Sequence, residues 1–536
     1  MKIKTLLSTL LIVSSTVFGQ NLENAIKNTD NELFTKSEEE IKALIAKEPT
    51  KGINYYYLGE NFYQRKETDS ALVYWAKAFE KDPTSPISFV SNGKALLVKG
   101  DLTGANEQFN KALTTTKRKN AEIIRNIANA YIVTGGKNYD EIISLLQRAI
   151  EIDGKNENNF ILMGDVLLAK SPDNVNEAIK NYNLVLDINP KSARGIVRKG
   201  KIYQRLNTNS TDSLANEFFK EAQRLDPNYA PAYRENAELF LNSNKPKKAI
   251  ENWKIYLELN NSLEARYRYA TALYSGKQYC DAVTELNNLK QAGFSNIYTL
   301  RILTYSLAEC TSDKENAQRG LQSSEEYFKI APKEKIIYLD YKYKGQLLAN
   351  AGKDSLAIAE YEKVASMDEK AKKEVCGLIA KSYMKAKNYA KAIENYEYKA
   401  QNSTLTATEL FELGRAYYVG PKNYQLADTT FAKLTTLSPS FVSGHFWRGR
   451  ASYQLDPKNE KWLAKPYYEK AFDLIKVEDR LTGNNKSVTL ESAKYLGNYY
   501  YSSITKDIEK AKNYWKVVQE MDANDPEAKA FFAKVK

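Results

Sequence analysis

The sequence contains few histidines and cysteines, the residue types on which most zinc sites and many nucleophilic active sites depend. It has one histidine, His445, which is followed directly by Phe446 and Trp447, and three cysteines. A histidine-based zinc site requires several histidine or cysteine ligands that such a chain cannot supply, and a catalytic triad would have to use His445. We therefore expect His445 to pack within the fold, and we predict no metal site.

Two Ser-x-x-Lys patterns, Ser91 to Lys94 and Ser382 to Lys385, have the spacing found in serine acylases. Both lie in segments with helical periodicity, and a pattern with two fixed positions often arises by chance. The sequence has no phosphate-binding glycine loop, no paired-cysteine motif and no recognisable pair of catalytic carboxylates. We therefore predict no catalytic residue and no cofactor, and an enzyme with an unrecognised site is only a third hypothesis.

The three cysteines, Cys280, Cys310 and Cys376, cannot all pair within one chain. Cys280 and Cys310 fall near matching turns of successive segments, so a disulfide between them is a hypothesis. Cys376 lies on a helix face with Val375 and Ile379, which predicts a buried thiol without a reactive role.

The N-terminal segment 1–19 has the features of a secretory signal peptide. Lys2 and Lys4 precede an apolar stretch, and Val17 and Gly19 fit the small-residue cleavage rule, which places the mature start at Gln20. No cysteine lies near that junction, so we do not expect a lipoprotein, and we find no segment apolar enough to span a membrane. These features predict export to a periplasm.

The formal charge of the chain is +12, and removal of Lys2 and Lys4 leaves 12 − 2 = +10 on the mature chain. An exported protein rarely meets nucleic acid, so we expect no nucleic-acid partner. Acidic protein segments, anionic glycans and lipid headgroups are the available anionic partners.

Small residues about thirty-five positions apart recur along the chain, and each is followed by a second small residue and then by a large side chain. The first copy contains Gly59, Ala71 and Trp75, and the next contains Gly93 and Phe109. A spacing of four residues places the second small residue and the ring on one helix face, so each ring can fill the space that a small residue leaves. The first small positions are Gly59, Gly93, Ala128, Gly164, Gly200, Ala237, Ala270, Gly345, Ala380, Gly414, Gly449 and Gly497.

This residue order resembles the tetratricopeptide repeat (TPR). The resemblance implies an all-α fold, a right-handed superhelical solenoid of about 13 helix-turn-helix repeats with capping helices. We divide the chain into signal peptide 1–19, N-terminal cap 20–51, repeats 52–296, a degenerate repeat 297–332, repeats 333–525 and C-terminal cap 526–536. We expect longer turns within the hairpins at 207–212 and two other places, and an exposed loop around Thr482 to Asn485.

In proteins of this family the first helices line a concave groove that holds an extended peptide or a partner helix. We therefore predict groove residues one helical turn from the small positions, with cations and aromatic rings interleaved in the C-terminal part. Arginine and lysine suit carboxylates, and tyrosine offers stacking area. The predicted groove residues are Tyr56, Tyr63, Arg125, Arg194, Lys201, Arg234, Tyr267, Tyr274, Lys342, Lys381, Arg415, Tyr418, Phe446, Arg450, Tyr453, Lys494 and Tyr501.

These observations favour a non-enzymatic scaffold or adaptor in the periplasm that binds a protein or an extended, acidic peptide. We connect it with an envelope assembly such as outer-membrane biogenesis or secretion. The alternative is a peptidoglycan- or glycan-binding protein that uses the aromatic and basic groove. The sequence does not identify the partner, the pathway or the oligomeric state.

Overall fold

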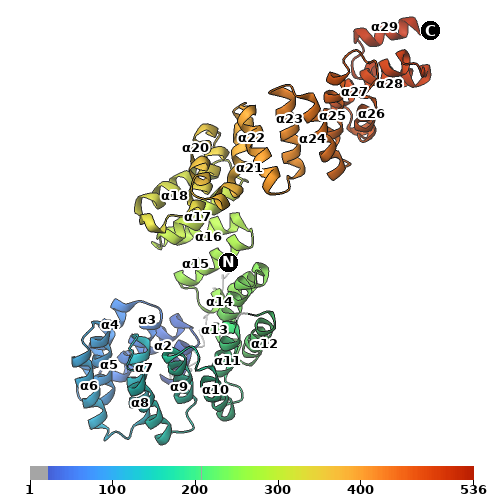
Figure 1. Ribbon diagram of the computed structural model, residues 1–536. Helices are drawn as coiled ribbons and strands as arrows, with labels where there is room; N and C mark the ends of the chain where they lie inside the picture. The colour runs from blue at the N-terminus through green and yellow to red at the C-terminus, as the bar shows by residue number, and fades with distance from the viewer. Residues whose placement is uncertain (1–21, 207, 536) are drawn as a thin grey trace, which may run out of the picture. The chain divides into compact units, whose positions relative to one another are not determined.

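The computed structural model describes residues 22–206 and 208–535, and every regular element within these ranges is a helix (Figure 1). The predicted signal peptide and the mature start at Gln20 lie outside the described residues. The chain divides into two compact units, Met1–Phe294 and Ser295–Lys536. None of the described helices is both long enough and apolar enough to cross a bilayer.

Helices of the first unit pair into consecutive antiparallel hairpins, each packed on the next. They are α1 (Leu22–Asp30), α2 (Phe34–Lys47), α3 (Gly52–Gln64), α4 (Thr68–Lys81), α5 (Pro86–Val98), α6 (Leu102–Thr115), α7 (Ala121–Val133), α8 (Tyr139–Ile152), α9 (Glu157–Lys170), α10 (Val175–Ile188), α11 (Ala193–Leu206), α12 (Asn209–Leu225), α13 (Ala230–Asn242), α14 (Pro246–Leu259), α15 (Leu263–Ser275) and α16 (Tyr279–Gln291).

The second unit continues the same arrangement. Its helices are α17 (Ile297–Glu309), α18 (Asn316–Ile330), α19 (Tyr338–Asn350), α20 (Asp354–Ala365), α21 (Glu369–Lys385), α22 (Tyr389–Asn402), α23 (Ala407–Val419), α24 (Tyr424–Leu437), α25 (Val442–Leu455), α26 (Lys465–Asp473), α27 (Gly483–Ser502), α28 (Ile508–Met521) and α29 (Pro526–Lys534), with short 3-10 helices at Lys333–Lys335 and Val477–Asp479. From α3 to α28 the described helices form thirteen hairpins, which confirms the predicted helical solenoid and its repeat number.

The same type of turn joins the two helices in several of the hairpins. In the α3–α4 turn Lys66 has a φ of +65°, and the amide of Glu67 donates to the carbonyl of Phe62. These are the features of a Schellman helix end. The α1–α2 turn repeats them, because Glu32 has a φ of +60° and the amide of Leu33 donates to the carbonyl of Asn28. The N-terminal segment is therefore a hairpin of the same type with a shortened first helix.

The small residues of the first helices form notches that receive rings from the second helices. A Cβ atom added at Gly414 would lie 2.5 Å from Cε1 of Phe431, and one added at Gly345 would lie 2.6 Å from Cε1 of Tyr361. Real Cβ atoms do not approach that closely, so only glycine allows the two helices to pack at this distance. The predicted alternation of small and large side chains is confirmed at these positions.

Three segments differ in detail from their predicted form. Residues 209–212 belong to α12, which is 17 residues long, so most of the predicted long turn is an added turn of helix. The expected loop at Thr482 to Asn485 is helical from Gly483, with Thr482 as the N-cap residue of the 20-residue α27. The segment 297–332 contains a complete hairpin, α17 and α18, in which Gly320 lies against Leu347.

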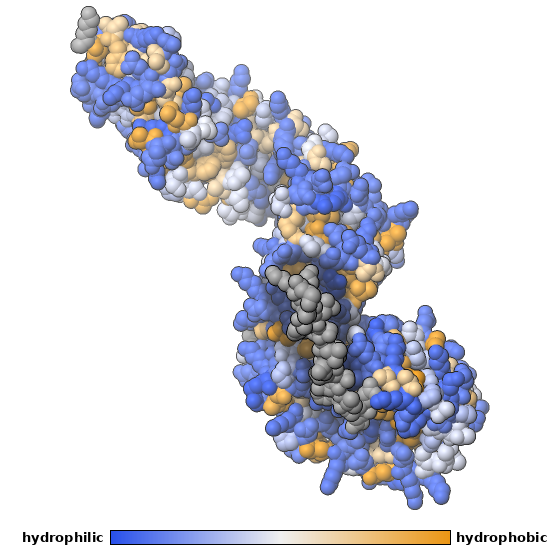
Figure 2. All heavy atoms as spheres, turned by 180° about the vertical axis from the view of Figure 1, so that it is seen from behind, coloured by the Kyte–Doolittle hydropathy of each residue, from blue (hydrophilic) through white to orange (hydrophobic). Residues whose placement is uncertain are grey.

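Rings cover the C-terminal end of the helical array. Phe531 of α29 is 5% exposed and stacks on Trp515 of α28 with 5.7 Å between ring centroids. Elsewhere large apolar side chains reach the surface singly, for example Leu102, Leu356 and Val477. On the face shown in Figure 2, hydrophilic residues predominate and apolar residues form only small separate patches.

The cysteines have different states. Cys376 is a free cysteine with 1% of its surface exposed, and burial raises the pKa of its thiol. Cys280 and Cys310 are both disulfide-bonded.

We expect Gly414→Ala to lower stability, because the added methyl group would meet the ring of Phe431. Overpacking of this kind costs about 1–3 kcal/mol, which exceeds the gain of about 1 kcal/mol from replacing a helical glycine. A thermal-unfolding double-mutant cycle with Phe431→Leu provides the test. The double variant should lose less than the sum of the two single losses, and strict additivity would contradict the notch contact.

Thiol titration should give three different results under three conditions. The native protein should react slowly, because Cys376 is buried and its pKa is raised. The denatured, unreduced protein should show one thiol, and the denatured, reduced protein should show three, in accordance with one free and two bonded cysteines. Three thiols before reduction would show that the disulfide does not form.

Candidate binding cleft

A cleft of about 370 Å³ lies within the first unit. The first helices of six successive hairpins line it, and each contributes a polar side chain. These residues are Tyr56 of α3, Lys94 of α5, Arg125 of α7, Asn158 of α9, Arg194 of α11 and Arg234 of α13. The structure thus brings together six of the predicted groove residues, namely Tyr56, Tyr63, Arg125, Arg194, Lys201 and Arg234, although Tyr56 is only 1% exposed and its ring belongs mainly to the core.

The α1–α2 turn closes one side of this cleft. Figure 1 shows the hairpins of the first unit following a curve, so that the blue N-terminal helices lie beside the green helices around α13. The amide of Ala230, the first residue of α13, donates to the carbonyl of Asn31 at 3.3 Å. Residues some 200 positions apart in the sequence therefore form one continuous lining.

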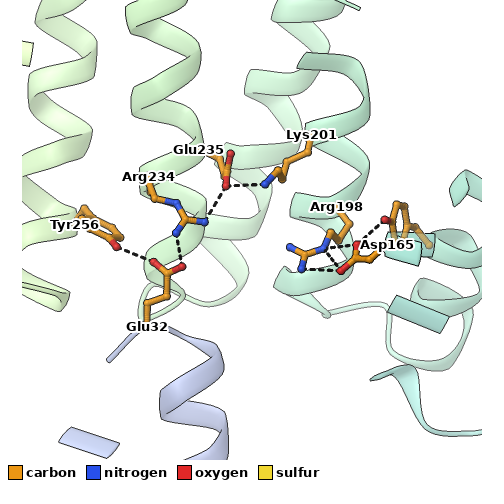
Figure 3. Close-up of polar contacts among 8 residues, drawn as sticks. Glu32, Asp165, Arg198, Lys201, Arg234, Glu235 and Tyr256 are labelled. Atoms are coloured by element: carbon orange, nitrogen blue, oxygen red, sulfur yellow. Dashed lines mark hydrogen bonds and ion pairs between the residues drawn. The ribbon is translucent and has the colours of Figure 1, made fainter. Parts of the chain in front are cut away.

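Two acidic residues of the turn bind arginines of the opposite wall. Asp30 pairs with Arg194 at 3.0 Å. The carboxylate of Glu32 accepts a hydrogen bond from Arg234 and a second one, at 2.7 Å, from the hydroxyl of Tyr256 on α14 (Figure 3). Burial tends to lower the pKa of Arg234, but the charges of Glu32 and Glu235 outweigh it and raise that pKa, so the arginine stays charged.

A second pair joins α9 and α11. Arg198 makes a bidentate contact with Asp165 at 2.8 and 3.0 Å, and the hydroxyl of Tyr182 donates to the same carboxylate at 2.7 Å (Figure 3). Burial alone would raise the pKa of Asp165, but the charge of Arg198 and the two donors lower it. Because a lowered carboxylate pKa stabilises the fold above the unfolded pKa, this contribution is lost when the pH falls through the folded pKa.

The third pair is almost fully buried. The ammonium of Lys94, whose residue is 0% exposed, lies 2.7 and 2.8 Å from the two carboxylate oxygens of Glu60. It also lies 5.0 Å from the ring of Trp75. Burial lowers the pKa of Lys94, and Glu60 opposes that shift. Ser91 is buried as well and donates to the carbonyl of Trp75, so the Ser91-x-x-Lys94 pattern is structural here.

Arg125 is the least neutralised cation of the cleft. Among the residues that the structure describes, Lys94, Arg194, Arg198, Lys201 and Arg234 each have an ion pair. Arg125 has none there, and its guanidinium makes one long contact of 3.4 Å with Oδ1 of Asn159. Beside it, Asn126 is 8% exposed, and its buried Nδ2 has no hydrogen-bond partner.

The predicted C-terminal groove residues are mostly paired within the chain. Arg450 makes a bidentate contact with Glu491 at 2.8 and 2.5 Å. Lys494 contacts Asp525 at 2.5 Å and Glu527 at 3.0 Å. The acids that neutralise this surface come from the following repeat, which is why the sequence had suggested an open cationic wall.

Other predicted groove residues in the second unit vary in environment. Lys342 pairs with Glu374 and Arg415 with Glu412, both at 3.3 Å, whereas Lys381 is exposed. Phe446 is only 4% exposed, so its ring belongs to the core and offers no groove surface. The rings of Tyr418, Tyr453 and Tyr501 contact Trp447, Tyr495 and Phe531 respectively.

The remaining sequence candidates lie outside the cleft. Tyr267 and Tyr274 of α15 are half-buried and contact the rings of Phe294 and Tyr279. The Nε2 atom of His445 lies 2.9 Å from the carbonyl oxygen of Pro439, and burial lowers the pKa of the ring. In the second Ser-x-x-Lys pattern, Lys385 pairs with Asp354 at 3.5 Å.

Sequence reasoning missed the acidic turn and its receptors. The partners of Asp30 and Glu32 follow 164 to 224 positions later, so no local pattern connects them. The one available signal was the presence of two acids, Asp30 and Glu32, in a hairpin turn of a basic chain.

We expect Glu60→Gln to destabilise the first unit, because it leaves the buried Lys94 without a counter-charge. Breaking a buried ion pair from one side costs about 3–5 kcal/mol. The substitution also removes the interaction that opposes the fall in the Lys94 pKa. Because the unfolded chain then binds a proton that the folded chain does not, stability of the variant should rise with pH between neutral and about 10.

Glu80→Gln is the matched control for that experiment, because it breaks an exposed pair with Lys81 at 2.8 Å. Thermal unfolding of this control should match the parent at each pH. A Glu60→Gln variant as stable as the parent at pH 7 would contradict the proposed role of the buried pair.

No family model matches the chain. Among solved structures, the C-terminal part of a TPR repeat-containing protein from Cytophaga hutchinsonii is 28% identical, over 49% of this chain and 98% of that chain, with a TM-score of 0.41. The TPR domain of P58(IPK) is 17% identical over 70% and 99%, with a TM-score of 0.31. A thermophilic TPR protein from Thermus thermophilus is 18% identical over 35% and 100%, also with a TM-score of 0.31.

These whole-chain scores are low, and the repeat itself is the stronger identifying feature. It consists of thirteen stacked hairpins, several of which share the same turn, and rings such as Phe431 fill glycine notches in them. The described part of the chain therefore has the helix-turn-helix repeat architecture of tetratricopeptide-repeat proteins.

Proposed function

We propose that this protein is an exported, non-enzymatic scaffold that binds a protein or peptide partner in the cleft of its first unit. One observation carries the proposal: the first helices of six successive hairpins line a single polar cleft of about 370 Å³. Its lining combines guanidinium groups with tyrosine rings, which are the side chains that contribute most often to protein recognition.

The chemistry of the cleft favours a polar, anionic partner. Six cations and four carboxylates line it, so the lining has a net positive charge of two. Arg125 lacks an ion pair within the described residues, and the adjacent Asn126 has a buried amide nitrogen with no acceptor. A carboxylate or carbonyl oxygen of a partner could satisfy both groups.

Two features support export to the periplasm. The segment 1–19 has the pattern of a signal peptide, and a pair of disulfide-bonded cysteines is typical of an oxidising compartment. We place the protein within an envelope assembly such as outer-membrane biogenesis or secretion on this basis.

Affinity capture from envelope extract tests the proposal. The parent should retain one or two proteins in fixed proportion, and Arg125→Glu should lose them, because a carboxylate would replace the least neutralised cation. Arg118→Glu reverses the same charge on an exposed residue outside the cleft lining and should retain the partner. Equal capture by both variants would contradict the cleft as the binding site. Recovery with purified cell wall instead of protein would favour the alternative glycan-binding function.

A further inference from the structure

The α1–α2 turn occupies the part of the cleft in which an acidic partner would bind. Its residues 30–32 contain two carboxylates separated by one residue. Asp30 contacts Arg194, and Glu32 contacts Arg234 of the opposite wall (Figure 3 shows the second contact). Asn31, which lies between them, reaches the Ala230 amide through its carbonyl and Asp226 through its side chain at 3.4 Å. The turn thus contacts the opposite wall through the side chains of Asp30, Asn31 and Glu32 and through one main-chain hydrogen bond.

The receptor side of this contact has the features of a built recognition site. Arg194 is held by Asn158 at 2.7 Å, and Arg234 is held by Glu235 at 2.9 Å, which itself contacts Lys201 at 3.0 Å. The hydroxyl of Tyr256 also receives a hydrogen bond from Asn260 at 2.8 Å. These contacts with residues outside the turn orient the two arginines and the Tyr256 hydroxyl. The arginines therefore need not rearrange when the turn leaves.

The contacts that hold the turn are of a kind that can be broken. The side chains of Asp30 and Arg194 are 31% and 22% exposed, so water screens this ion pair, whereas in the second pair Arg234 is 35% and Glu32 14% exposed. One main-chain bond supports them, at 3.3 Å. Each hairpin of a solenoid contacts mainly its neighbours, so small rotations between successive hairpins can add up to open the closed side.

We infer that the wall formed by Arg194, Arg234 and Tyr256 is a recognition site for a partner segment with two carboxylates separated by one residue. The acidic α1–α2 turn occupies this site until the partner displaces it. This inference rests on the proposed binding function.

Asp30→Asn with Glu32→Gln tests this inference, because the double variant keeps the size of both side chains and removes their charge. The probe is a fluorescent nine-residue peptide with the sequence of residues 27–35, KNTDNELFT, titrated into the full chain at low salt. We expect the variant to bind the peptide about tenfold more tightly than the parent. This factor results if the turn occupies the site in about nine of ten parent molecules, because only about one molecule in ten is then free to bind. About 1 M salt should abolish the binding, because it screens charges beyond about 3 Å.

Glu39→Gln with Asp69→Asn is the matched control, because it removes the same charge from two exposed residues outside the cleft lining. It should bind the peptide as weakly as the parent. Adding Arg194→Gln and Arg234→Gln to the turn variant should abolish its binding. Hydrogen exchange of residues 226–234 should be faster in the turn variant, because the Ala230 amide loses its contact with the Asn31 carbonyl and keeps only the one with the Asn228 carbonyl.

Two results would overturn the inference. If the turn variant exchanges faster around Ala230 but binds the peptide no better than the parent, the wall does not recognise such a segment. If exchange is unchanged and binding is unchanged, the acids do not hold the turn. In either case the proposed binding function would still be supported if the parent captured a partner and Arg125→Glu lost it. The two proposals can therefore be refuted independently of each other.

Discussion

The contact between an aromatic ring and a glycine or alanine notch sets the geometry of both units. At Gly414 and Gly345 there is no room for a Cβ beside the facing ring, so helix separation is fixed by the ring and the bare backbone. The same contact recurs at Gly200 with Phe219 and at Gly497 with Trp515. Because this packing is dense, the two helices of each such hairpin have one separation, and the first helix of each presents the corresponding face outward.

That register explains how a cleft forms without a dedicated domain. Tyr56, Arg125 and Arg234 each lie three residues before the small residue of their helix, on α3, α7 and α13, so the repeat places them on equivalent faces. The curve of the first unit places them around one space of about 370 Å³. Once the side chains face one another, burial makes the Glu60–Lys94 and Asp165–Arg198 pairs interdependent, because a lost partner would leave an uncompensated charge.

The sequence was sufficient for the repeat and only partly for the site. The spacing of small residues and rings reflects contacts between adjacent helices, so it predicted the hairpins. Positions counted from the small residues then included six residues of the cleft. Ion pairs between repeats depend on positions 31 to 41 residues apart, as with Lys494 and Asp525 or Arg450 and Glu491, and such pairs have no local pattern. Because these pairs have no local pattern, the sequence did not reveal that acids neutralise the predicted cationic wall of the second unit. The helical start of α27 was missed because glycine and asparagine usually mark turns.

Closure of the first unit connects stability with recognition. A hairpin at the end of a solenoid has only one neighbour to cover its apolar face, so it needs further contacts to stay ordered. Here the α1–α2 hairpin gains them by placing Asp30 and Glu32 against Arg194 and Arg234. An apolar contact would have held the turn more firmly, but a polar partner could not then replace the turn in the site. Partly exposed ion pairs are weak enough to yield and specific enough to select what replaces them.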